Sequence, residues 1–260
     1  MKFASLGSGS EGNALLVSTA AESSCTTIMV DCGFGIRETE QRLAKLHLLP
    51  QQIDGIVVTH EHQDHIGGVF KFAQKHRIPV WLSFGTFQAS RQTHANVRIN
   101  FCRDGEAFSI KGLELHPFTV PHDAREPLQY AISDNCNRLG VLTDIGQSTS
   151  HVVDSLGTCD ALVLECNHDR QMLAKSSYPH SLKQRIGGLY GHLSNQVSAE
   201  ILEAVDQSKL KKVIAAHLSR QNNSADLAYA AMAGALESDN AEISVACQDN
   251  GFDWINLGKA

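Results

Sequence analysis

The sequence predicts an α/β protein in which two β-sheets pack together and helices cover their outer faces. Short apolar runs alternate with helical patterns along most of the 260 residues, whereas Val97 to Thr143 reads as successive strands with tight turns such as Asp134-Asn135. No repeat, low-complexity tract or linker interrupts the pattern. We therefore expect one domain that spans residues 1–260.

The expected strands are short apolar runs, several of which end at polar residues. In chain order they are Lys2–Leu6, Ala14–Ser18, Thr26–Val30, Gly55–Thr59, Val80–Leu82, Val97–Phe101, Leu113–Thr119, Gln129–Ser133, Arg138–Thr143, Ala161–Glu165, Lys212–Ala216, Glu242–Ala246 and Asp253–Ile255.

The expected helices are segments with a helical spacing of apolar residues. They are Ile36–Leu48, Gly67–His76, Phe84–Arg91, Gln147–Ser155, Asp169–Lys175, His180–Gly187, Asn195–Gln207 and Ser224–Leu236. The last one begins Asn222-Asn223-Ser224, residue types that commonly cap a helix N-terminus.

The composition is that of an ordinary globular protein with a sizeable core, because 42% of the residues are hydrophobic and 19% are charged. The net charge of −6 argues against a protein that coats nucleic acid through general electrostatics. It leaves room for a local basic groove and for a bound cation that offsets acidic ligands.

Seven cysteines are scattered along the chain without a CxxC pair, which argues against a disulfide framework or a thiolate zinc site. Reduced cysteines fit a cytoplasmic location. The N-terminus becomes glycine-rich too early for a signal peptide. No apolar run reaches the roughly 18 residues that a membrane span needs. We therefore expect a cytoplasmic protein that does not enter a membrane.

The chemistry is indicated by the segment His60-Glu61-His62-Gln63-Asp64-His65, which follows an apolar strand. In an extended stretch His60 and His62 point the same way and can bind one ion together. Asp64 and His65 come on the turn into the next helix and can face a neighbouring ion. Imidazole and carboxylate ligands suit zinc, manganese or iron(II). The alternative, a histidine-rich surface loop, is disfavoured by this density of ligands.

Further ligands must come from distant residues, and three candidates follow predicted strands. Asp144 ends one strand, and a carboxylate there can bridge two ions; His122 and His217 lie just past two others. For any one of them alone, a structural or surface role is as reasonable as ligation. Their common placement at strand ends favours ligation for all three.

These residues resemble the metallo-β-lactamase superfamily. The HxHxDH signature is His60, His62, Asp64 and His65, and the remaining motifs follow in family order at Asp31, His122, Asp144 and His217. The resemblance implies an αββα four-layer sandwich with two divalent ions at one edge. One ion would be bound by His60, His62 and His122, and the second by Asp64, His65 and His217. Asp144 would bridge them, and Asp31 would orient the cluster's backbone or a ligand histidine.

A closer resemblance is to the YycJ/WalJ family, whose members are regarded as nucleases with a proposed 5′-to-3′ DNA exonuclease activity. It rests on the loop Gly7–Asn13, on Glu165-Cys166-Asn167-His168-Asp169, and on Gly191-His192-Leu193-Ser194-Asn195. Glu165 and His192 also resemble the pair that tRNase Z places beside its metals. The chain lacks both the long inserted arm of tRNase Z and a β-CASP insertion.

The implied reaction is attack of a hydroxide, shared by two ions about 3.5–4 Å apart, on phosphorus. The leaving sugar oxygen needs a proton, for which His192, held by Glu165, is the candidate donor. The alternative for His192 is a residue at the entry of a helix capped by Ser194 or Asn195. We count Asp64 with the catalytic residues as well as the ligands.

Other candidates are less specific. Backbone N–H groups of the Gly7–Asn13 loop can face phosphate, with Ser10 and Asn13 as substrate or supporting contacts, although a plain tight turn is the alternative. His168 is either an extra metal or phosphate contact or a satisfied structural histidine. Lys183, Arg185 and Arg220 are possible phosphate contacts but are expected mostly as solvated surface charges.

We therefore expect a dinuclear metal-dependent hydrolase that acts on nucleic acid, with DNA favoured over RNA and zinc favoured over manganese or iron. The second hypothesis is a glyoxalase II-like thioester or ester hydrolase, which would not need the Glu165–His192 pair. The third is a non-catalytic, metal-stabilised module that binds a partner. The oligomeric state stays open.

Overall fold

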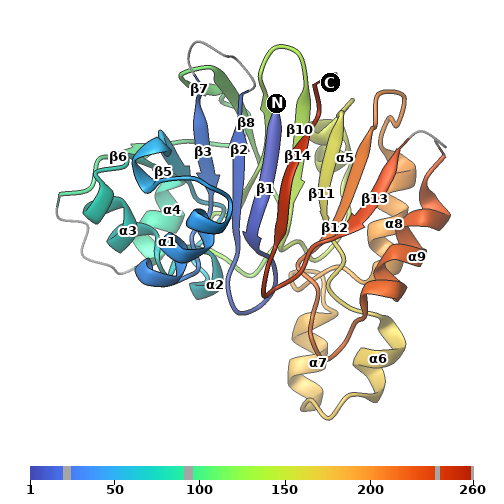
Figure 1. Cartoon of the computed structure of the whole chain (residues 1–260). Helices are drawn as coiled ribbons and strands as arrows, with labels where there is room; N and C mark the ends of the chain where they lie inside the picture. The colour runs from blue at the N-terminus through green and yellow to red at the C-terminus, as the bar shows by residue number, and fades with distance from the viewer. Residues whose placement is uncertain (20–24, 91–95, 238–240, 259–260) are drawn as a thin grey trace.

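The expected sandwich of two sheets between helical layers is confirmed (Figure 1). The structure is a computed structural model, and it describes residues 1–19, 25–90, 96–237 and 241–258. Within these ranges the strands form two seven-stranded sheets. Apolar side chains of both sheets, such as Val30 of the first and Val163 of the second, share the core between them.

The first sheet has the order β14-β1-β2-β3-β4-β5-β6, in which β3 to β6 run parallel and the other neighbours antiparallel. Its strands are β1 (Lys2–Gly7), β2 (Ala14–Ser18), β3 (Thr27–Val30), β4 (Gly55–Val57), β5 (Val80–Leu82), β6 (Ile99–Phe101) and β14 (Phe252–Asn256). The C-terminal strand β14 therefore lies beside β1, and the two ends of the chain share one sheet.

The second sheet has the order β13-β12-β11-β10-β9-β8-β7. Its strands are β7 (Phe108–Ile110), β8 (Leu113–Thr119), β9 (Leu128–Ser133), β10 (Arg138–Leu142), β11 (Ala161–Glu165), β12 (Lys212–Ala216) and β13 (Glu242–Val245). β7 to β10 are antiparallel, whereas β10 to β13 are parallel. The sequence prediction omitted β7, a three-residue strand that is too short for a recognisable alternation.

Helices cover the outer face of each sheet. The first sheet carries α1 (Ile36–Lys45), the short α2 (Gln63–Ile66), α3 (Val69–His76) and α4 (Phe84–Ala89), and the second carries α5 (Ser150–Leu156), α8 (Asn195–Ala204) and α9 (Ala225–Ala235). A 3-10 turn, Pro50–Gln52, precedes β4. The observed helices α1, α4 and α8 end two or three residues before the predicted ends, and α2 was not predicted as a separate helix. The predicted end of α4, Arg91, lies outside the described residues.

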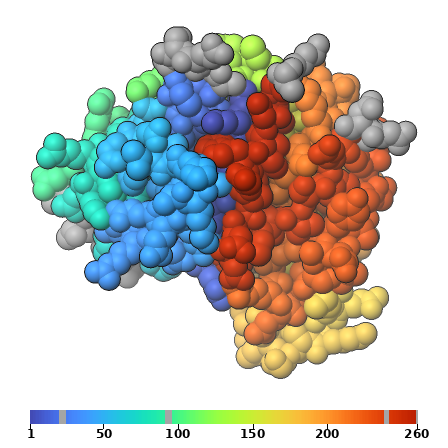
Figure 2. Space-filling model, in the orientation of Figure 1, coloured from blue at the N-terminus to red at the C-terminus, as the bar shows by residue number. Residues whose placement is uncertain are grey.

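Two further helices, α6 (Arg170–Lys175) and α7 (His180–Ile186), form an arm that projects beyond the sheets. Figure 2 shows this arm in yellow at the lower end of the molecule. Within the described ranges, no helix combines the length and the apolar composition that crossing a bilayer requires.

Successive side chains of a strand point alternately into the core between the two sheets and into the core between a sheet and its helices. In β3, Ile28 and Val30 face the core between the sheets, whereas Met29 faces the helices. Burying each such side chain stabilises the fold by about 1.5–3 kcal/mol. The parallel strands β3 and β4 of one sheet and β10 to β12 of the other each end at a common edge, which is where the candidate site residues follow.

Candidate metal centre

Three candidate residues adopt left-handed backbone conformations at strand ends. Asp31 follows β3 with φ 59°, Asp144 comes two residues after β10 with φ 56°, and His217 follows β12 with φ 55°. This conformation is uncommon for residues other than glycine and costs about 1–3 kcal/mol each. The surrounding packing therefore holds sharp turns at the points where the three side chains enter the site.

The first cluster consists of His60, His62 and His122, whose ligand atoms lie within 4.8 Å of one another. His122 Nε2 lies 3.2 Å from His62 Nδ1. On its other side, His122 Nδ1 lies 3.0 Å from the Gly191 carbonyl oxygen, which can only accept a hydrogen bond. Nδ1–H therefore donates there, and the lone pair of Nε2 faces the cluster.

The second cluster consists of Asp64, His65, Asp144 and His217, again with ligand atoms within 4.8 Å of one another. His65 Nδ1 donates to Asp31 Oδ2 at 2.8 Å, so that Nε2 faces the cluster. His65 Nε2 lies 2.9 Å from Asp144 Oδ2 and 3.5 Å from Asp64 Oδ2.

Asp31 also acts on the first cluster through Thr59, which sequence reasoning did not single out. Asp31 accepts hydrogen bonds from the Thr59 amide and from the Thr59 hydroxyl, both at 2.8 Å. The hydroxyl oxygen, having donated its proton, can accept from His60 Nδ1 at 2.9 Å. One buried carboxylate therefore orients histidines of both clusters.

Asp144 lies between the clusters and is 2% exposed. Its Oδ1 is 3.9 Å from His122 Nε2, whereas its Oδ2 is 3.6 Å from His217 Nε2. Although Oδ2 is also close to His65 Nε2, it has no hydrogen-bond partner of suitable geometry among the described residues. The two carboxylate oxygens thus face different clusters.

Glu165 and His192 form the third part of the site. His192 Nδ1 lies 2.8 Å from Glu165 Oε1, and Glu165 Oε2 accepts from the Leu193 amide at 3.0 Å. Glu165 Oε1 also lies 3.3 Å from His217 Nδ1, a contact that sequence reasoning missed. Because Nδ1–H of His192 donates to Glu165, the nitrogen that His192 leaves for another group is Nε2.

The buried histidines and carboxylates of the site together favour a bound cation. Burial, opposed by nearby Asp144, lowers the pKa of His60 and of His122, so both rings are neutral at pH 7 and have a lone pair to offer a cation. Burial alone would also lower the pKa of His217, but Asp144, Asp64 and Glu165 raise it to about 10. Buried carboxylates of this number need protons or cations beside them.

Two observations show that these donor atoms suit divalent ions. His60 Nε2 and Asp144 Oδ2 are buried and lack hydrogen-bond partners among the described residues, although each points into a cluster of ligand atoms. The donors are imidazole nitrogens and carboxylate oxygens, the set preferred by zinc, manganese and iron(II). The structure thus brings all seven sequence-predicted ligands together in two adjoining groups.

The glycine-rich loop contributes supporting contacts. Asn13 closes the loop by bonding to Gly9 in both directions, and its Nδ2 lies 3.1 Å from His65 Nε2. Ser10 is exposed and is not brought to either cluster. Its neighbour Ser8, which sequence reasoning missed, accepts a hydrogen bond from the His217 amide at 2.9 Å.

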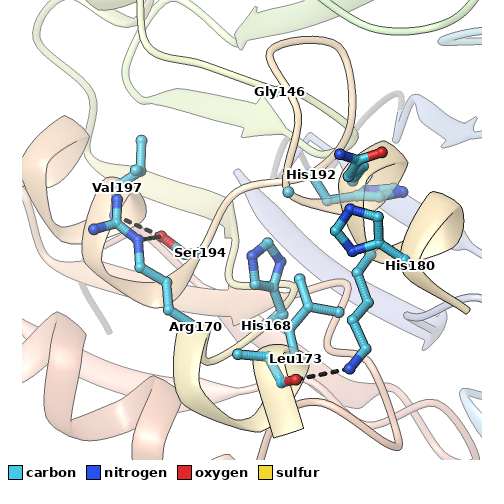
Figure 3. A pocket seen from close by; sticks show the side chains of 12 residues that line it. Gly146, His168, Arg170, Leu173, His180, His192, Ser194 and Val197 are labelled. Atoms are coloured by element: carbon cyan, nitrogen blue, oxygen red, sulfur yellow. Dashed lines mark hydrogen bonds between the residues drawn. The ribbon is translucent and has the colours of Figure 1, made fainter. Parts of the chain in front are cut away.

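His168 lies outside both clusters and is 3% exposed. Burial lowers its pKa to about 4, so that the ring is neutral. Its Nδ1 has no hydrogen-bond partner among the described residues. His168 and His192 both line a cavity beside the metal ligands (Figure 3). The neighbouring Asn167, another residue that sequence reasoning missed, donates to the His217 carbonyl at 3.1 Å.

Comparisons with known proteins bear on the family and the fold of this chain. A model of the β-lactamase superfamily domain matches residues 26–218. Exodeoxyribonuclease YycJ of Bacillus anthracis is 32% identical over 256 residues, which cover 97% of this chain and 96% of that protein. Exodeoxyribonuclease WalJ of Streptococcus pneumoniae is 30% identical over 94% of this chain and 91% of that protein. The metallo-β-lactamase fold protein YhfI of Bacillus subtilis superposes with a TM-score of 0.73 at 13% identity, covering 96% and 97% of the two chains.

Proposed function

Because this chain belongs to the metallo-β-lactamase superfamily, in the family of YycJ and WalJ, we propose that it hydrolyses the phosphodiester bonds of DNA as a 5′-to-3′ exonuclease. That it is a metal-dependent hydrolase follows from its family and its donor set. The choice of DNA rests on the names of the two relatives.

The observation that carries the proposal is the pair formed by Glu165 and His192 beside the two clusters. His192 Nδ1 is held by Glu165 at 2.8 Å and lies 3.5 Å from Asp144 Oδ1, so that its Nε2 is available for a proton transfer next to the ligands. Phosphodiester hydrolysis expels an alkoxide, which needs a proton, whereas thioester hydrolysis expels a thiolate, which does not. The pair therefore favours the phosphodiesterase over the thioester hydrolase.

In this proposal His60, His62 and His122 hold one divalent ion, and Asp64, His65 and His217 hold the second, with Asp144 shared. Zinc is the first expectation, and manganese or iron are the alternatives. When bound, such ions supply an activated water and neutralise charge on the phosphoryl oxygens. Asp31 and Thr59 keep the ligand histidines in one orientation.

The side chains of the protein then supply the proton transfers of the reaction. Water adds its oxygen to phosphorus while the bond between phosphorus and the sugar oxygen breaks. His192 Nε2 donates a proton to that sugar oxygen, and Glu165 stabilises the protonated ring beforehand. The proton that water releases passes to solvent, and Asp64, with a side chain 22% exposed, is the most exposed member of the second cluster. The non-catalytic alternative offers no reason for a proton donor at this position.

The test is a substrate panel run with manganese and with zinc. We expect 5′-labelled duplex or single-stranded DNA to release terminal nucleotides, whereas a chromogenic thioester is not turned over. His192→Gln should lose about 100-fold or more in kcat, and His151→Gln, an exposed histidine on α5, should keep it. Internal cleavage products would contradict the exonuclease, and thioester turnover without DNA hydrolysis would contradict the nuclease.

A further inference from the structure

A cavity of about 540 Å³ opens beside His192, between the α6–α7 arm and the start of α8 (Figure 3). This volume falls in the range of about 300–1,000 Å³ found for pockets that bind one small ligand. The metal ligands are not part of its lining, although His192 is. The cavity therefore continues the active site on the side of the proton donor.

The charged side chains that line the cavity are cationic. Arg170 donates to Ser194 Oγ at 3.1 Å and to Gln196 Oε1, and Lys183 Nζ donates to the Ala174 carbonyl at 2.7 Å. These partners are neutral, and no ion pair with a carboxylate is found for either cation among the described residues. No acidic side chain belongs to the described lining.

Two other cations near the site pair with carboxylates. Arg185, on the same helix as Lys183, pairs with Asp123 at 2.7 Å, and Arg220 pairs with Asp249. Arg170 and Lys183, by contrast, have no carboxylate partner among the described residues, which suits an anionic ligand.

His168 adds an independent indication of a ligand. In Figure 3 its ring stands between the Arg170 side chain and the His180 ring. The residue is 3% exposed, and its Nδ1 lacks a hydrogen-bond partner among the described residues. A buried polar atom without a partner is unfavourable, and a ligand that reaches it removes that cost. Apolar side chains of Leu173 and Val197 complete the lining and can contact the face of a base.

We propose that this cavity binds the 5′-terminal nucleotide of the substrate, with its 5′-phosphate at Arg170 and Lys183. The inference rests on the proposed function. His192 protonates the oxygen that leaves phosphorus, so the nucleotide that owns this oxygen lies on the His192 side of the scissile bond. Its 3′ oxygen is at His192 Nε2, and its 5′-phosphate extends into the cavity.

The reaction then balances as follows. The bond between phosphorus and the 3′ oxygen breaks, the 3′ oxygen takes the proton of His192, and the oxygen of water becomes attached to phosphorus. The products are a nucleoside 5′-monophosphate and a DNA strand shortened by one nucleotide. The shortened strand carries a new 5′-phosphate and is again a substrate for the same cavity.

The test compares kcat/KM on two DNA strands that differ only in a 5′-phosphate or a 5′-hydroxyl. We expect the wild type to prefer the 5′-phosphate by about tenfold or more, because charge-assisted contacts of this kind are worth that factor. Lys183→Gln and Arg170→Gln should lose most of the preference. Lys175→Gln, the same change on the arm but outside the cavity lining, should keep it.

Calorimetric titration with deoxyadenosine 5′-monophosphate supplies a second measurement that does not depend on turnover. We expect Lys183→Gln to bind it about tenfold more weakly than the wild type or Lys175→Gln. If DNA is hydrolysed without a 5′-phosphate preference, or Lys183→Gln keeps the preference, the cavity proposal is overturned and the nuclease stands. If no DNA is hydrolysed, the nuclease proposal falls, and absence of nucleotide binding would then overturn the cavity proposal as well.

Discussion

Two buried carboxylates of this site each hold two histidines. Asp31 accepts from His65 directly and fixes His60 through the Thr59 hydroxyl. Glu165 contacts both His192 and His217. Since a carboxylate can only accept, it determines which ring nitrogen carries the proton and which one faces the centre of the site.

Asp31→Asn tests this orienting role, because it keeps the shape of the side chain and removes its charge. We expect the affinity for manganese or zinc to fall about 10–100-fold, the usual effect of losing such a partner behind a ligand. Competition with a chromogenic chelator measures it. Asp104→Asn, which changes an exposed carboxylate beside His151, should leave the affinity unchanged. Equal affinities in the two variants would show that Asp31 does not orient the ligands.

Glu165→Gln tests the proton donor through its pH dependence. Burial opposes protonation of His192, but the charge of Glu165 and its hydrogen bond raise the pKa of His192 above its ordinary value. A donor must be protonated, so activity falls as the pH rises through this pKa. We therefore expect the alkaline limb of the kcat profile to move to lower pH in Glu165→Gln, measured at saturating metal. An unmoved limb would exclude His192 as the titrating donor.

The clustering of the candidate histidines could be predicted from the sequence because their density and order are distinctive, whereas the residues behind them could not. Thr59, Ser8 and Asn167 make their contacts through hydroxyl or amide groups, which have no characteristic spacing in the sequence. Their contacts depend on where distant strands end. Ser10 illustrates the difficulty, since it shares a loop with Ser8 and yet stays exposed.

At the level of elements, most strands could be predicted because each is a continuous apolar run between polar residues. The short helix α2 could not, because four residues are too few to show a helical period. Its position is set by packing instead. A Cβ atom added to Gly33 would lie 1.9 Å from the Asp64 carbonyl oxygen, so the α2 backbone rests directly on the loop after β3.

Gly33→Ala should therefore displace α2 and the two ligands that it carries. We expect a loss of roughly 1–3 kcal/mol in the free energy of unfolding, typical of overpacking, together with weaker metal binding. Urea denaturation and chelator competition measure the two effects. Gly35→Ala is the matched control, because a Cβ there meets nothing within 4 Å. The close packing would be refuted by equal stability of the two variants.

For the whole molecule, the site joins the two halves of the sandwich. Asp31, His60 and His65 follow strands of the first sheet, whereas His122, Asp144 and His217 follow strands of the second. Ions bound between them would connect both sheets in the folded state alone. Binding to the folded state alone raises stability in proportion to the logarithm of the ion concentration.

The pH dependence of that effect follows from the pKa values of the buried groups. Carboxylates around His217 raise its pKa from 6.5 to about 10 against the effect of burial, so its proton stabilises the fold below pH 6.5. This contribution is lost as the pH rises through 10. Glu165 behaves oppositely: despite burial, His192 and His217 lower its pKa from 4.5 to about 2, and its contribution is lost as the pH falls toward 2.

Protein stripped of divalent ions by chelation should therefore become less stable between pH 6.5 and 8.5, because the unfolded chain releases the His217 proton above pH 6.5 whereas the folded chain keeps it up to about pH 10. Divalent ions replace that positive charge, and they bind more tightly when they do not compete with protons. We expect the increase in Tm on adding ions, followed by calorimetry, to be larger at pH 8.5 than at pH 6.5. His151→Gln should retain this difference, and Asp144→Asn should lose most of it. If adding ions leaves the Tm unchanged at both pH values, the two clusters do not bind metal.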